Sequence, residues 1–159
     1  ADKIMSLVRA GESKTVEFKE SFVWDKQKNT KNPELEIASL KTIVAFLNTN
    51  GGTLLIGVSD TGEIVGIRED TRVNQNNNDK FMLHLKNKIK DKIGEQFYPF
   101  INQKLVSVLG VDVLMIECKA STTPCSLEGK AFYVRTNPAI DKLDGLKLAE
   151  YVLNHFKNQ

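Results

Sequence analysis

The chain is poor in the residues that build metal centres and disulfide frameworks. It has two cysteines, Cys118 and Cys125, and two histidines, His84 and His155. The cysteines lie seven positions apart, which is the wrong spacing for a CxxC clip, and the histidines lie in different segments. A structural zinc site is therefore not expected. We interpret both thiols as buried or neutral side chains.

The chain also lacks a long apolar run. No segment approaches the roughly 20 apolar residues needed to cross a bilayer, and residues 1–13 contain no apolar core of a secretory signal. We therefore expect no membrane association. Two thiols without an export signal fit a reducing, cytoplasmic location. The chain does not begin with methionine, which fits a processed, tagged or excised piece of a longer protein.

Charge of either sign is not in large excess, because the formal net charge is only +2. The lysines are nevertheless clustered: residues 79–94 hold five lysines against two aspartates, and residues 26–31 hold three. Such runs fit solvated helix and loop surface, and they also fit contacts to phosphate groups. The residues that we expect to contact phosphate are Lys26, Lys28, Lys80, Lys86, Lys88, Lys90, Lys92 and Arg135.

The apolar pattern predicts one α+β domain over residues 1–159, a mixed β-sheet with packed helices. Helices are expected over 2–10, 34–48, 80–93 and 144–156, the last one capped by Asp144. Strands are expected over 15–19, 53–58, 63–67, 104–109, 111–118 and 131–135, with polar loops over 24–33 and 69–79. The run TLLIGV, residues 53–58, is typical of a strand buried on both faces. Its buried side chains should be Leu54, Leu55, Ile56 and Val58, with Leu40, Val44 and Leu47 packed on the sheet.

The segment from Gly57 to Gly62 has the glycine spacing that begins a phosphate-binding loop. Such a loop needs a lysine and a serine or threonine directly after its second glycine, and a helix that begins there. Here Gly62 is followed by Glu63 and Ile64. A carboxylate at that position repels phosphate, so we interpret the segment as the tight turn of a hairpin between residues 53–58 and 63–67.

Three acidic residues indicate a second kind of chemistry. Glu12 and Glu17 flank the first predicted strand, and Asp60 follows the central one. If the two strands are neighbours, the three carboxylates can converge and bind a divalent cation that activates water for attack on a phosphodiester. We expect Lys19 on the other face of the strand. The same acids also fit a turn aspartate, a capping or surface glutamate, and a glutamate on a wet sheet face.

Three stretches together resemble a known family. They are GESKTVEFKESF, IVAFLNTNGGTLLIGVSDTGEIVGI and YVRTN. They are similar to the Schlafen-type AlbA domain, also described as a divergent Alba-like DNA-binding domain, and the resemblance is strongest over residues 11–137. It implies an α+β nucleic-acid-binding module, which in many bacterial members is assigned to transcriptional regulators.

The resemblance also implies an alternative activity. Some animal relatives are endoribonucleases with two glutamates spaced five apart and an aspartate after the apolar strand, a pattern that Glu12, Glu17 and Asp60 match. Those enzymes use two such lobes, so this chain would have to form a homodimer to build a comparable groove.

Three hypotheses therefore stand beside one another. The first is a DNA- or RNA-binding module that acts through phosphate contacts and requires no cofactor. The second is an RNase that uses Mg²⁺ or Mn²⁺. The third is a protein-interaction or dimerisation domain.

Overall fold

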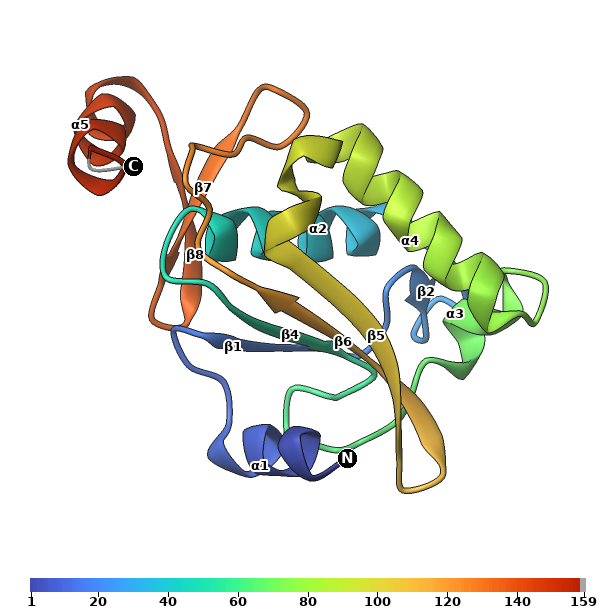
Figure 1. The fold of residues 1–159 in the computed structure, drawn as a ribbon. Helices are drawn as coiled ribbons and strands as arrows, with labels where there is room; N and C mark the ends of the chain where they lie inside the picture. The colour runs from blue at the N-terminus through green and yellow to red at the C-terminus, as the bar shows by residue number, and fades with distance from the viewer. Residues whose placement is uncertain (158–159) are drawn as a thin grey trace.

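A four-stranded mixed sheet forms the centre of the computed structural model, which describes residues 1–157. Its strands are β1 (Val16–Lys19), β4 (Gly52–Ile56), β5 (Ile101–Val108) and β6 (Val111–Cys118), in the order β1-β4-β6-β5. β1 runs parallel to β4, and the other neighbours are antiparallel (Figure 1). The prediction of an α+β fold with a mixed sheet is confirmed.

Helices cover both faces of this sheet. α2 (Pro33–Leu47) and α4 (Asn78–Lys92) lie on one face, and α1 (Asp2–Ala10) lies on the other (Figure 1). α2 begins where the Asn32 side chain accepts the backbone N–H of Glu34, with Pro33 in the first turn. The predicted helices over 2–10, 34–48 and 80–93 are confirmed to within two residues.

The central strand separates two apolar clusters. Leu54 and Ile56 face α2 and α4, whereas Leu55 faces α1, because successive side chains of a strand point to opposite faces. The predicted residues of this strand and of α2 are all fully buried, which confirms the expected core. They are Leu40, Val44, Leu47, Leu54, Leu55, Ile56 and Val58.

The predicted strand over residues 63–67 is wrong. A single bridge joins Val58 to Ile64, and the N–H groups of Val65 and Gly66 then both bind the carbonyl of Gly57, so no regular ladder continues. Gly66 has a φ of 78°, and its backbone lies so close to Gly57 that a Cβ on Gly57 would be 3.0 Å from it. This close backbone packing replaces the second half of a hairpin ladder, and α3 (Arg68–Arg72) begins directly afterwards.

Two small hairpins lie outside the central sheet. β2 (Trp24–Asp25) pairs with β3 (Thr30–Lys31) inside the region predicted to be a polar loop. β7 (Phe132–Thr136), which matches the predicted strand over 131–135, pairs with β8 (Ala139–Leu143) in a separate two-stranded sheet. The predicted polar loop over 69–79 holds most of α3, and a 3₁₀ helix, η1 (Glu95–Phe100), precedes β5.

The last helix, α5 (Gly145–His155), stands apart from the sheet beyond β7 and β8 (Figure 1). Asp144 occupies its N-cap position, but the Asp144 side chain makes no capping hydrogen bond. Leu148 and Val152 of this helix are only half-buried, and no residue of α5 is fully buried. One anchor is the Tyr151 hydroxyl, which donates to the carbonyl of Asn48 at the end of α2.

Candidate nucleic-acid interface

The β2–β3 hairpin has a preset turn. Asp25 Oδ1 accepts the backbone N–H groups of Gln27 and Lys28, both at 3.0 Å, and Asp25 Oδ2 accepts the Asn32 side-chain amide at 3.2 Å. The Lys28 N–H and the Asn32 amide lower the pKa of Asp25, because they stabilise its charged form. The chain turns at Asn29, which has a φ of 52°. The hairpin is therefore held by its own polar groups.

A buried carboxylate ties the base of this hairpin to α3. Asp70 has no exposed surface and accepts three consecutive backbone N–H groups, from Phe22 at 2.7 Å, Val23 at 2.9 Å and Trp24 at 3.0 Å. Burial raises the pKa of Asp70, and these three donors act in the opposite direction. The guanidinium of Arg72 lies 4.6 Å from the centre of the Trp24 ring. Sequence reasoning missed this support because Asp70 falls in a predicted polar loop.

The hairpin presents cations to solvent. Lys28 and Lys31 are exposed, and neither has an ion-pair partner among residues 1–157. Lys26 lies 3.5 Å from Glu20. Beside the hairpin is a groove of about 300 Å³, with Lys19 and Lys26 among its lining residues. The other lining residues are Glu20, Ser21, Trp24, Asp25, Gln27, Leu35 and Ala38.

The lysines of α4 are mostly engaged within the protein. Lys92 Nζ lies 2.7 Å from Glu128, and Lys88 Nζ lies 3.9 Å from Glu36. Lys80 donates to Gln75 at 2.5 Å, and Lys86 Nζ lies 5.6 Å from the centre of the Tyr98 ring. Within the described part of the chain only Lys90, of these five, has no such partner.

The prediction that Arg135 contacts phosphate is wrong, because its side chain is buried. The residue is 2% exposed, and its guanidinium donates to the carbonyls of Ser13 and Val16 at 2.7 and 3.1 Å. It also donates to Lys14 O at 3.2 Å and pairs with Glu17 Oε1 at 2.6 Å. Arg135 therefore fastens β7 to the turn before β1.

The three predicted metal-binding carboxylates do not come together. Glu12 Oε2 accepts the backbone N–H of Phe18 at 3.0 Å, and Glu17 pairs with Arg135. Asp60 is exposed in a turn, six positions beyond Leu54, which is the strand partner of Glu17. Residues 1–157 contain no group of three or more His, Cys, Asp or Glu side chains that could hold a metal ion. The predicted convergence is wrong.

The surroundings of Glu17 also differ from those of a metal ligand. Burial and the neighbouring Glu12 raise the pKa of Glu17, whereas Arg135 and Lys19 act in the opposite direction. Lys19 Nζ lies 3.9 Å from Glu17 Oε2, so Lys19 is on the same face of β1 and not on the opposite face as expected. Two positions along a strand is one full side-chain period, which explains the shared face.

Glu12 and Arg135 cover the free edge of the sheet. β1 is an edge strand, and such a strand exposes unpaired N–H and C=O groups that invite pairing with another chain. Here the Glu12 carboxylate binds the N–H of Phe18, and the Arg135 guanidinium binds the carbonyl of Val16. These contacts give the first and last resembling stretches a structural role.

A mixed sheet with helices on both faces, a covered edge strand and a basic hairpin define a small α+β domain. Residues 12–144 match the model of the family described as Schlafen, AlbA_2, and the chain belongs to this family. None of the curated protein sequences matches it.

Several solved structures share the fold, including the following two. One is the DIP2311 protein from Corynebacterium diphtheriae, 19% identical with a TM-score of 0.61; the match covers 97% of this chain and 32% of that one. This chain therefore spans about a third of the length of DIP2311. The other is the N-terminal domain of a RecG-related protein from Nitrosomonas europaea, named for an ATP-dependent DNA helicase. It is 18% identical with a TM-score of 0.56, over 91% of this chain and 92% of that one.

Within residues 1–157 no helix is both long enough and apolar enough to cross a membrane. Both cysteines are free and buried, as the sequence predicted.

Proposed function

We propose that this domain binds nucleic acid through phosphate contacts centred on the β2–β3 hairpin. The observation that carries the proposal is the combination of a turn fixed by Asp25 with lysines that point into solvent. An unpaired lysine can exchange bound counterions for a phosphate, whereas a lysine held by a carboxylate must first lose that partner. Lys28 and Lys31 meet this condition.

The adjoining groove extends the same surface. Lys19 and Lys26 line it, together with the hydroxyl of Ser21 and the amide of Gln27. Hydroxyl, amide and ammonium groups are the donors that bind phosphate and sugar oxygens without reading sequence. The family resemblance to DNA-binding domains, and the helicase-related name of one structural relative, support nucleic acid as the partner.

We assign the lysines of α4 a secondary role in binding nucleic acid. Lys80 and Lys90 can add peripheral contacts, whereas Lys88 and Lys92 already have carboxylate partners. We therefore rank the hairpin above α4, although the charge pattern alone favours α4, which carries the larger number of lysines.

The experiment compares three charge-reversal variants by fluorescence anisotropy with labelled tRNA and labelled duplex DNA. The first changes Lys26, Lys28 and Lys31 to Glu, and the second changes Lys80, Lys86 and Lys90 to Glu. The second set omits Lys88, because a glutamate there would lie beside Glu36. The control variant changes three other exposed lysines to Glu: Lys142 in β8, Lys147 in α5 and Lys157 after α5.

We expect the hairpin variant to lose the most affinity for both ligands. Its salt dependence on duplex DNA should become shallower by about 0.9 for each phosphate that the variant no longer binds. The control, which has the same change in net charge, should lose little. Equal losses in the hairpin and control variants would mean that only overall charge matters and would refute the proposed surface. No binding of wild type to either ligand would leave a protein-interaction domain as the remaining hypothesis.

The RNase alternative has no supporting geometry in this conformation. Its metal would need Glu12, Glu17 and Asp60 together, but Arg135 already supplies the cation beside Glu17, and Asp60 lies elsewhere. Incubation of labelled tRNA with and without Mn²⁺ tests it directly. Metal-dependent cutting that Asp60→Asn abolishes would establish the RNase, and we expect none.

A further inference from the structure

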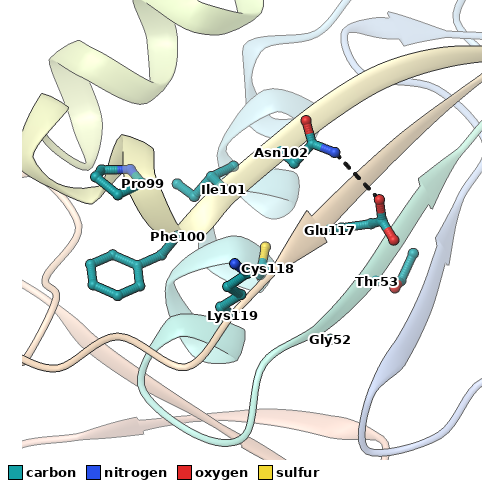
Figure 2. Close-up of a pocket in the computed structure, with 9 residues that line it drawn as sticks. All are labelled: Gly52, Thr53, Pro99, Phe100, Ile101, Asn102, Glu117, Cys118 and Lys119. Atoms are coloured by element: carbon teal, nitrogen blue, oxygen red, sulfur yellow. Dashed lines mark hydrogen bonds between the residues drawn. The ribbon is translucent and has the colours of Figure 1, made fainter.

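A second pocket lies at the end of the central sheet, where Gly52, Cys118 and Ile101 are paired; Ile101 and Cys118 belong to the cluster on the α2 face. Thr53, Glu117 and Asn102 occupy one register row across β4, β6 and β5. Thr53 is two positions from Leu55, so this row shares the face that packs on α1. The pocket has a volume of about 510 Å³ and is shown in Figure 2.

The two sides of this pocket differ in chemistry. Figure 2 shows the side chains of Pro99 and Phe100 on one side and those of Glu117 and Thr53 on the other, with Asn102 above and Lys119 below. The first side offers an apolar wall, which is suited to an aromatic ring. The second offers a carboxylate, a hydroxyl and an amide, which are suited to a hydrogen-bonding edge.

Cations surround the Glu117 carboxylate. Lys3 binds Glu117 Oε2, Lys104 Nζ lies 3.5 Å from Oε1, and Asn102 Nδ2 lies 3.4 Å from the same oxygen. Lys3 is the main reason that the pKa of Glu117 is lowered, so the group stays ionised and acts only as an acceptor. With Lys119 the site has three ammonium groups to one carboxylate. It therefore favours a ligand that carries negative charge and also presents donors.

We infer that this pocket binds the base of a guanine nucleotide. The Glu117 carboxylate accepts hydrogen bonds from the donor edge of the base, the Asn102 amide donates to O6, and the Lys119 ammonium binds the phosphate. Guanine presents two adjacent donors, N1–H and N2–H, to which one carboxylate can bind in parallel. The contact of Asn102 with Glu117 is at the limit of a hydrogen bond, so its amide is free to turn towards O6. Pro99 and Phe100 contact the apolar body of the purine.

The other bases lack this pair of adjacent hydrogen-bond donors. Adenine and cytosine place a ring acceptor beside their amino donor, and uracil has one donor between two acceptors. Each would set an acceptor lone pair against a charged oxygen of Glu117, leaving the carboxylate partly unpaired. The pocket goes beyond the proposed phosphate surface, because it recognises a base and lies on a different part of the molecule from the hairpin.

Isothermal titration calorimetry with GMP and AMP at one fixed salt concentration tests the inference. Wild type should bind GMP roughly tenfold or more tightly than AMP, because AMP leaves an acceptor unsatisfied. In Glu117→Gln the ratio should fall to about one. The matched control is Glu63→Gln, in an exposed turn, which should keep the wild-type ratio. The ratio of the GMP affinity to the AMP affinity is the readout, because removing the negative charge of Glu117 raises the affinity for the phosphate of both nucleotides.

NMR on the wild-type protein provides a test that needs no variant. GMP should shift the amide signals of Thr53, Asn102 and Lys119, and AMP at the same concentration should shift them less. Equal binding of the two nucleotides, or no binding of GMP at millimolar concentration, overturns the inference. The hairpin variant should retain the GMP preference, so failure of the guanine pocket and failure of the phosphate surface are distinguishable.

Discussion

Arg135→Met should destabilise the domain strongly and leave its nucleic-acid affinity unchanged. The Arg135 side chain is 1% exposed and that of Glu17 is 15% exposed, so the substitution leaves a mostly buried carboxylate without its partner. Removing one member of a buried ion pair costs about 3–5 kcal/mol. Domains have a total free energy of unfolding of about 5–15 kcal/mol, so this is a large share. Urea denaturation followed by circular dichroism measures it.

A double variant identifies the cause of this loss. Adding Glu17→Gln to Arg135→Met removes the uncompensated charge, so the pair of changes should be less destabilising than Arg135→Met alone. Lys130→Met is the control for loss of an exposed cation, and it should change stability by less than about 0.5 kcal/mol. An Arg135→Met protein with wild-type stability and weakened nucleic-acid binding would refute the reasoning, because Arg135 would then contact phosphate.

Three further predictions concern other parts of the molecule. Burial raises the pKa of Cys125 to about 12 and raises that of Cys118 further, so neither native thiol should react with Ellman's reagent at pH 8; rapid labelling without unfolding would contradict this. Asp25→Ala should loosen the hairpin and weaken nucleic-acid binding. Since the pKa of Asp25 is lowered in the folded state, its contribution should be present above the ordinary value of 3.8 and lost as the pH falls through the lowered one. The amide signals of Gln27 and Lys28 report that loss, and signals that stay unchanged in acid would count against it. ATP should not bind through residues 57–62, because Glu63 follows the turn and α3 begins only at Arg68; calorimetric binding that Gly62→Ala abolishes would show otherwise.

Local signals were sufficient for α2 and for the central strand, but not for α3, most of which lies in the predicted polar loop over 69–79. Asn32 and Pro33 mark the start of α2 through a side-chain cap and a fixed φ, and the apolar run after it can only be buried. The strand predicted over 63–67 failed because the sequence does not show that Gly57 and Gly66 pack backbone against backbone. A glycine in a short apolar segment fits either a strand or a close approach, and only the tertiary structure distinguishes them.

The site was harder to predict because the state of a charged group depends on distant partners. Arg135 and Glu17 are 118 positions apart, and Lys88 and Lys92 are neutralised by Glu36 and Glu128 from other elements. A charge run therefore identified lysines correctly as surface residues but could not indicate which of them remain free. Lys28 is exposed on a turn that is held by a near neighbour, Asp25, and its contact with phosphate stays a prediction.

The acidic motif can be explained by structure without catalysis. At the free edge of β1, Glu12 accepts the N–H of Phe18 and Arg135 donates to the carbonyl of Val16. Glu17 balances the charge of the buried guanidinium. Asp60 has no part in this arrangement. A catalytic role would require all three carboxylates at one ion, so the two explanations differ at Asp60. Because the structural role accounts for Glu12 and Glu17 by contacts already made, their match to the nuclease pattern carries little weight on its own. Evidence for an RNase would have to come from Asp60.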